Sequence, residues 1–529
     1  MPTISKFLLS HSNSVVDTMY SQRSSRLALA NLLVLASLTS AVSYDPVVPC
    51  SSLTVTPPEG ATVINATGTE RYNVTYTLSP TYNGVAGSIN ICDMEVFLTH
   101  GDAGDQVRFS IYLPLKGWNG RWQGTGGGGF TAGGFDFELV PAVTSGYSAG
   151  STDAGVPLDG NTDVWYNNTQ LVDNFVYLSL HEMTVLGKEL SEQFYGKKPE
   201  YSYWFGCSTG GRRGYSEAQR YPEDYDGIFA GSPAINWAQL TVADYWPIVA
   251  QNIAGGDVPM CKFEAMGNAS VAVCDSLDGA KDGLISNPLI CHFDATTMVG
   301  KEVPCGNSTA KITNEDATVW NSIRHGPAGE EGRSLWYGLQ PGTDYNDQAA
   351  RPGFEISLQV IADFLAGTPG LDITKMNQSQ FVDYFDQSLS KLKAVWGTDN
   401  PDLSAFKARG GKLVTWHGWS DNLIAPQGTL DYWKRVVDTM GGEEEVDDFY
   451  RVFMAPGFAH CGGGPGPQLP TDNLAPVVEW LEKGIAPETF LFSGNGQSRA
   501  LCKYPKELEY KGYGNVSDAS SWKCVTNGP

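Results

Sequence analysis

A serine between glycines is the first feature of this sequence that could do chemistry. Residues 206–210 read GCSTG, which fits the pattern Gly-x-Ser-x-Gly, in which a strained strand-to-helix turn exposes a nucleophilic serine. The pattern also occurs around Ser148, so the motif alone does not identify a nucleophile. Ser208 follows a strand-like run and precedes a helix-like one, whereas Ser148 is followed by a loop with Gly and Pro. We therefore predict Ser208 as the nucleophile and interpret Ser148 as a strand or loop serine.

A serine hydroxyl needs a neighbouring base, usually a histidine that is oriented by a carboxylate. In enzymes with this turn, the acid and then the histidine follow the serine along the chain. His460 lies in a loop rich in Pro and Gly after a strand-like run, where loops at the carboxyl ends of strands carry function. Asp421 follows the preceding strand-like run by four residues, although an Asx turn is its alternative interpretation. We predict His460 as the base and Asp421 as the residue that orients it.

The other histidines that follow Ser208 are weaker candidates for the base. His417 lies inside a strand pattern and is interpreted as a packed or hydrogen-bonded side chain, while His292 and His325 lie in the middle of the chain.

Two cysteines adjoin the predicted nucleophile and base. Cys207 immediately precedes Ser208, and Cys461 immediately follows His460. A disulfide requires Cα atoms only about 4.4–6.8 Å apart. If the serine and histidine lie within hydrogen-bond reach, these two cysteines can bridge and clamp them together.

Ester and amide hydrolysis also needs donors aimed at the developing oxyanion. The backbone N–H of Thr209, directly after the nucleophile, is the first predicted donor. The second is expected in the stretch 124–129, GTGGGG, with Gly127 and Gly128 both open as candidates, because glycines let a backbone approach a ligand closely. A phosphate-binding loop is the weaker alternative, since no Gly-Lys-Ser/Thr follows.

Strand and helix patterns alternate at both ends of the chain and are expected to position these residues. This alternation predicts an α/β protein with parallel strands. The middle carries cysteines, glycosylation sequons and helical segments without strong β runs, so it is interpreted as an insertion. The strand runs are 107–113, 201–205, 413–417 and 449–454, and the clearest helix runs are 172–194, 212–220 and 474–483. The predicted division is a signal peptide over 1–43, an α/β core over 44–236 and 397–529, and an inserted domain over 237–396.

Composition and the N-terminus bear on partners and compartment. The 529 residues carry a net charge of −23, so nucleic acid and anionic membrane surfaces are unexpected partners. Arg23 and Arg26 precede the apolar run 27–38 and the small residues 41–43, which is typical of a secretory signal peptide and too short for a membrane span. We therefore expect a secreted, extracellular protein.

The ten cysteines and the sequons agree with secretion. An even number of cysteines in a secreted chain favours five disulfides over free thiols. Several Asn-x-Ser/Thr sequons should be exposed and glycosylated. The sequons are at Asn65, Asn73, Asn167, Asn268, Asn307, Asn377 and Asn515.

At this point the sequence resembles the tannase and fungal feruloyl esterase family. The resemblance rests on Cys207-Ser208, Asp421 and His460-Cys461, and on the segments 205–234 and 417–424. It implies an α/β-hydrolase fold with a large lid inserted between the nucleophile and the catalytic acid, and a Cys207–Cys461 bridge. It also implies bridges Cys50–Cys92 and Cys502–Cys524, and the remaining Cys261 and Cys305 are then left to pair with each other.

An acidic loop at 274–284, CDSLDGAKDGL, suits Ca²⁺ in its residue types but fails the EF-hand pattern. Taken alone it is an acidic surface loop. The resemblance implies a structural Ca²⁺ site in the lid, closed by a Cys274–Cys291 bridge. The implied ligands are the side chains of Asp275, Asp278 and Asp282 and the carbonyls of Ala280 and Leu284.

Together these features predict a secreted serine carboxylic ester hydrolase that acts on aromatic acid esters without an organic cofactor. Feruloyl or other hydroxycinnamoyl esters of plant cell-wall polysaccharide are the first expected substrates, and galloyl esters, as in a tannase, are the alternative. A catalytically silent secreted binding glycoprotein is the alternative of another class, and it leaves the predicted triad unexplained.

Overall fold

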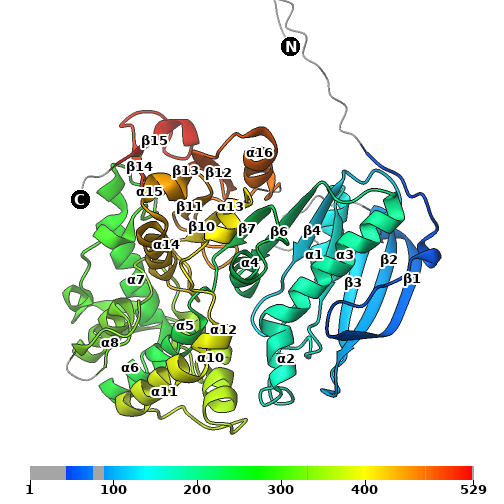
Figure 1. Cartoon of the computed structure of the whole chain (residues 1–529). Coiled ribbons are helices and arrows are strands. Elements are labelled where there is room, and N and C mark those ends of the chain that lie inside the picture. Colours follow the sequence, from blue (N-terminus) through cyan, green and yellow to red (C-terminus); the bar gives the residue numbers. More distant parts are fainter. Residues whose placement is uncertain (1–42, 76–87, 330–331, 471, 527–529) are drawn as a thin grey trace, which may run out of the picture. The chain divides into compact units, whose positions relative to one another are not determined.

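The computed structural model describes residues 43–75, 88–329, 332–470 and 472–526. All but the last residue of the predicted signal peptide lie outside them. Nine strands form one sheet in the order β1-β2-β3-β5-β4-β6-β7-β10-β11 (Figure 1). The strands are β1 (Ala61–Thr75), β2 (Ser88–His100), β3 (Val107–Pro114), β4 (Arg121–Thr125), β5 (Ser148–Thr152), β6 (Tyr201–Cys207), β7 (Gly227–Gly231), β10 (Lys412–Gly418) and β11 (Tyr450–Ala455).

The sheet has a parallel part and an antiparallel part. Strands β5, β4, β6, β7, β10 and β11 are parallel to their neighbours in that order, whereas β1, β2, β3 and β5 pair antiparallel. The predicted α/β class is therefore confirmed, but the expected parallel pairing fails at the N-terminal edge. The short connection over 101–106 explains this, because a tight turn joins antiparallel strands and a parallel pair needs a crossover.

Helices between the strands cover the sheet. The predicted helix 172–194 is α2 (Thr169–Asp173), a π turn (Asn174–Leu178) and α3 (Ser179–Tyr195), and it ends at Gly196 with φ 68°. Apolar residues of α3 join the core with tryptophans of β4 and β6, which fixes the helix on the sheet. The other helices outside the middle segment are α1 (Asp136–Thr144), α4 (Thr209–Arg220), α13 (Ser404–Ala408), α14 (Gln427–Met440), α15 (Glu443–Asp447) and α16 (Ala475–Lys483).

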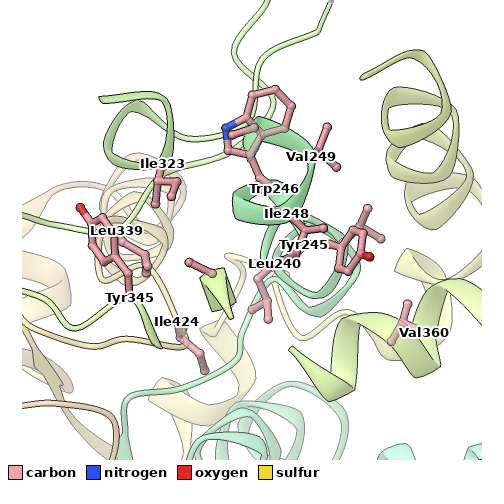
Figure 2. Packing of buried hydrophobic residues seen from close by; sticks show 14 of the residues in the cluster. Leu240, Tyr245, Trp246, Ile248, Val249, Ile323, Leu339, Tyr345, Val360 and Ile424 are labelled. Carbon is pink, nitrogen blue, oxygen red and sulfur yellow. The ribbon is translucent and has the colours of Figure 1, made fainter. Parts of the chain in front are cut away.

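The segment between β7 and β10 is mostly helical, although these two strands are neighbours in the sheet. It has its own buried cluster, part of which Figure 2 shows around Tyr245, Ile248 and Leu339. The cluster extends to Phe130, Trp165 and other residues that precede β6. Its elements are α5 (Trp237–Ala243), α6 (Trp246–Ala254), α7 (Met260–Cys274), β8 (Glu302–Cys305), β9 (Ser308–Lys311), α8 (Asn314–His325), α9 (Asn346–Ala349), α10 (Glu355–Gln359), α11 (Gln378–Lys391) and α12 (Lys393–Trp396).

The chain ends in two short antiparallel hairpins, and disulfides cross-link several of these parts. The hairpins are β12 (Thr489–Gly494) with β13 (Gln497–Cys502), and β14 (Glu507–Tyr510) with β15 (Trp522–Val525). The five predicted disulfides are all present: Cys50–Cys92, Cys207–Cys461, Cys261–Cys305, Cys274–Cys291 and Cys502–Cys524. Within the described residues, no helix combines the length and apolarity needed to cross a membrane.

Candidate active site

Ser208 occupies the sharp turn between β6 and α4, with φ 60° and ψ −122°. Such a conformation is costly for a non-glycine residue and is typical of functional sites. The two glycines of the motif make the turn possible: a Cβ on Gly206 would lie 2.5 Å from the Gly210 carbonyl, and one on Gly210 would overlap the Gly126 carbonyl oxygen. The Ser208 N–H donates to Gly231 O at 3.0 Å, which ties the turn to β7.

Asp421 and His460 follow the ends of β10 and β11 and are hydrogen-bonded to each other. His460 Nδ1 lies 2.9 Å from Asp421 Oδ2 and 3.1 Å from Oδ1. The carboxylate is fully buried, and its Oδ1 also accepts the N–H groups of Leu423 and Ile424 at 2.9 and 2.8 Å. Burial alone raises the pKa of a carboxyl group, but the facing His460 and His417 hold the pKa of Asp421 far below its ordinary value. Asp421 therefore remains ionised beside His460.

The Cys207–Cys461 disulfide holds nucleophile and histidine together, with Cα atoms 5.9 Å apart. Ser208 and His460 line the same cavity. In the described part of the chain no hydrogen bond joins their side chains, and such bonds commonly tighten only when substrate is present. The geometry is that of a serine with a histidine and a buried carboxylate behind it.

The structure distinguishes the two candidate glycines. The Gly127 N–H donates to Ala132 O at 3.0 Å and is therefore occupied. The N–H groups of Gly128 and Thr209 have no acceptor within the described residues, and a Cβ on Gly128 would meet nothing within 4 Å. Thr209 Oγ1 donates to Gly129 O at 2.9 Å, which fixes the glycine loop over the start of α4. The geometry favours Gly128 over Gly127.

The cavity at Ser208 has a volume of about 570 Å³, within the range of small-molecule sites. Its walls come from the glycine loop, from α5 and α10 of the middle segment, and from the segment after β10. Leu240 and Ile424, both drawn in Figure 2, are among its apolar lining residues. Aromatic side chains also contribute: Phe130, Phe137, Trp237 and Phe354.

Two buried residues of the site were not predicted. His417 is buried and hydrogen-bonded, as its interpretation as a packed or hydrogen-bonded strand histidine expected, but its contact with the candidate acid was not predicted: His417 Nε2 lies 3.0 Å from Asp421 Oδ2. The four-residue spacing to Asp421 was the available signal. Asp244, at the end of α5, lines the cavity, and its Oδ2 is buried without a hydrogen-bond partner. Burial, together with the nearby Asp421, raises the pKa of Asp244 well above its ordinary value. No local motif marks Asp244.

The alternative serine has no such setting. Ser148 is fully buried in β5, where its Oγ donates to Arg121 O at 3.2 Å and accepts from Ser191 Oγ at 2.8 Å. Its interpretation as a strand serine is confirmed.

The acidic loop of the predicted Ca²⁺ site is held by its own backbone. Asp275 Oδ1 accepts the N–H groups of Asp282 and Gly283, both at 3.0 Å, and Asp278 Oδ1 accepts the N–H of Ala280 at 3.0 Å. Among the described residues no three acidic, histidine or cysteine side chains converge closely enough to hold a metal. The donor types nevertheless fit Ca²⁺, because three carboxylates share one loop whose Ala280 and Leu284 carbonyls accept no described hydrogen bond.

The sequons occupy accessible positions. All seven asparagines are exposed: Asn65, Asn73, Asn167, Asn268, Asn307, Asn377 and Asn515.

Comparison with known proteins agrees with this geometry. A family model described as tannase and feruloyl esterase matches residues 94–525. A probable feruloyl esterase of Arthroderma benhamiae is 39% identical over 515 residues, covering 93% of this chain and 95% of the relative. A probable feruloyl esterase B-2 of Neosartorya fischeri is 33% identical over 453 residues, covering 79% and 84%.

Two solved structures resemble most of the chain. Tannin acyl hydrolase from Aspergillus niger superimposes with a TM-score of 0.80 at 26% identity, over 89% of this chain and 93% of that one. Feruloyl esterase B from Aspergillus oryzae superimposes with a TM-score of 0.78 at 28% identity, over 90% of this chain and 99% of that one.

The sheet, the turn at Ser208 and these matches define a carboxylic ester hydrolase with the α/β-hydrolase fold. Within that class, the chain belongs to the tannase and feruloyl esterase family.

Proposed function

We propose that this protein hydrolyses esters of hydroxycinnamic acids, such as feruloyl esters linked to plant cell-wall polysaccharide, through an acyl-enzyme on Ser208. The observation that carries the proposal is the strained Ser208 in a cavity with aromatic walls that it shares with His460, behind which Asp421 is buried and ionised. The names of the relatives agree with this substrate class.

The reaction follows from the atoms of this site. Ser208 Oγ attacks the ester carbonyl carbon while His460 Nε2 takes the hydroxyl proton. That proton passes to the alcohol oxygen as the ester C–O bond breaks, which leaves the acyl group on Ser208. Water then attacks the acyl carbon with His460 again as base, and the acid departs as the proton returns to Ser208 Oγ. Asp421, hydrogen-bonded to Nδ1, keeps Nε2 free to accept the proton and stabilises the charged ring.

Two free N–H groups supply the expected oxyanion site. Those of Thr209 and Gly128 have no described acceptor, so they are available to a carbonyl oxygen as it becomes negative. The Gly128 N–H belongs to the glycine loop and the Thr209 N–H to the first residue of α4, and the Thr209–Gly129 hydrogen bond joins these two segments, so both donors need little rearrangement during the reaction.

A comparison of activities tests the proposal. Wild type and S208A would be assayed on methyl ferulate, methyl caffeate, methyl gallate and tannic acid. We expect wild type to have its highest kcat/KM on the hydroxycinnamates and S208A to be inactive while it retains the wild-type melting temperature. Turnover retained by folded S208A would refute the assignment of the nucleophile.

Galloyl ester hydrolysis is the second candidate, favoured by the TM-score of 0.80 to a tannin acyl hydrolase. A higher kcat/KM on methyl gallate and tannic acid than on methyl ferulate would establish it in place of feruloyl esterase activity.

We further propose that the loop 274–284 binds a structural Ca²⁺. Burial is the main cause that raises the pKa of both Asp278 and Asp282, and the nearby Asp275 raises both further, so three carboxylates lie in one loop where a cation would be favourable. Arg499 forms an ion pair with Asp282, so one of the three carboxylates already has a cationic partner. Chelator followed by added CaCl₂ should lower and then restore the melting temperature. An unchanged melting temperature, with no Ca²⁺ found by metal analysis, would contradict the site.

Secretion and glycosylation complete the proposal. The predicted signal segment, five disulfides and seven exposed sequons support an extracellular glycoprotein. Expression in a fungal host should yield protein in the medium whose mass falls on treatment with an N-glycosidase.

A further inference from the structure

His417 lies where it can act on the acid behind the candidate base. Side chains alternate along a strand, and in β10 Leu413 joins the sheet core on one face while Val414 and Trp416 join a different cluster. His417 therefore shares the face of Leu413, on which α14 packs. Thr429 of α14 places its Oγ1 2.8 Å from His417 Nδ1, which fixes the rotation of the ring. His417 is fully buried.

The other ring nitrogen has only acceptors around it. His417 Nε2 lies 3.0 Å from Asp421 Oδ2 and 3.1 Å from Ile424 O. A carboxylate and a carbonyl only accept hydrogen bonds, so Nε2 carries the proton in this arrangement. Asp421 Oδ2 is thus shared by two imidazole rings, with His417 on the buried side and His460 on the side of the cavity.

We propose that His417 is a positioning residue: its Nε2–H, fixed by Thr429, holds the Asp421 carboxylate so that it aligns His460 for proton transfer. This rests on the proposed function, because it assigns His417 a role through the same Asp421 and His460. A carboxylate with donors on both oxygens cannot rotate freely: two backbone N–H groups hold Oδ1, and His417 is the side chain that holds Oδ2 from behind.

Removal of this donor should affect chemistry more than substrate binding. In H417L the Asp421 carboxylate gains freedom to rotate, and we expect kcat to fall about 10- to 100-fold, as for other outer partners of an essential group, with KM little changed. The charge of Asp421 would also be less dispersed, so it would attract protonated His460 more strongly. The acid limb of the kcat/KM–pH profile should therefore move to higher pH. The titratable groups facing Asp421 are His460, His417 and Asp244, whose pKa burial and Asp421 raise.

Three variants make the test specific. H417Q keeps an N–H near the position of Nε2 and should recover most of the wild-type kcat. T429V keeps the shape of Thr429 but removes its hydroxyl, and should lower kcat less than H417L with the same direction of pH shift. H325Q changes an exposed histidine of α8 and should behave as wild type. Melting temperatures would be compared for all.

The outcomes separate this proposal from packing alone. Wild-type kcat and pH profile in folded H417L would overturn it, as would equal loss of kcat in folded H417L and H417Q, since the N–H would then be irrelevant. If H417L does not fold, T429V decides: a lowered kcat with a shifted acid limb supports the proposal, and unchanged kinetics overturns it. S208A, which tests the nucleophile separately, distinguishes failure of this inference from failure of the proposed function.

Discussion

Two regions of the molecule pair a histidine with buried carboxylates, yet only one of the two rings lies at a cavity with a carboxylate on one side alone. At the antiparallel edge, His100 lies between Asp105, 2.6 Å from Nδ1, and Glu182, 2.7 Å from Nε2. At the ends of the parallel strands, His460 uses Nδ1 for Asp421, and its ring lies at the cavity that Ser208 lines.

The two histidines differ in whether a ring nitrogen remains without a carboxylate partner. Both His100 nitrogens face carboxylates, an arrangement that favours the protonated ring with both N–H groups donating. The hydrogen bond to Glu182, with that to Asp105, outweighs burial and raises the pKa of His100 to about 9. His460 has a carboxylate on one side only, which leaves Nε2 able to gain and lose a proton. A general base requires this asymmetry, and a structural ion pair does not.

The sharpest way to break the comparison is to remove each histidine and assay hydrolysis. We expect H460A to lose about 10⁴-fold or more in kcat, because the serine has no base left, while its melting temperature stays near that of wild type. H100Q should keep the kcat of wild type for the protein that remains folded. Steady-state kinetics on methyl ferulate checks both, and an active H460A would show that another group serves as base.

The next largest effect is on stability, and here H100Q, not H460A, should lose most. H100Q should lower the free energy of unfolding by about 3–5 kcal/mol, because it removes the cation from two buried carboxylates. Asp105 is further held by Asn174 Nδ2 at 2.7 Å, but Glu182 Oε2 has no hydrogen-bond partner in the described structure. Thermal and urea unfolding measure the loss. Equal stability of H100Q and wild type would mean that the buried ion pairs contribute nothing net.

The sequence predicted the grouping of Ser208, Asp421 and His460 but not that of His100 with its carboxylates, and the reason is physical. Ser208, Asp421 and His460 each follow a strand-like run, and cysteines flank two of them, so local signals sufficed. His100 and Glu182 are 82 residues apart, and their pairing depends on how β2 and α3 pack. The antiparallel edge, Asp244 and the choice of Gly128 were missed or left open for the same reason, since each depends on tertiary contacts.

Two disulfides allow the same comparison between the candidate site and the antiparallel edge, and the expected loss of stability is smaller. C207A/C461A should lose about 2–4 kcal/mol of stability and also kcat, because the bridge fixes the turn of Ser208 relative to His460. C50A/C92A, which removes the bridge between the N-terminal segment and β2, is the matched control and should lose stability but not kcat. Calorimetry and kinetics on both variants check this, and wild-type kcat in C207A/C461A would contradict the clamp.

Counted per pH unit, the smallest expected effect is the response of stability to pH, and it differs in sign between the two clusters. The folded-state pKa of His100, about 9, exceeds its unfolded value of about 6.5. Its contribution is therefore complete below about pH 6.5 and is lost as the pH rises through about 9, by at most about 1.4 kcal/mol per pH unit. The pKa of Asp421 is lowered on folding, so its contribution is present above its unfolded value of about 3.9 and is lost as the pH falls through its folded value.

Because the contribution of His100 disappears at high pH, the melting temperatures of wild type and H100Q between pH 6 and 10 should converge as the pH rises. H325Q, which alters an exposed histidine, should stay parallel to wild type throughout. Parallel curves for H100Q as well would mean that His100 is not the cation that its two carboxylates imply.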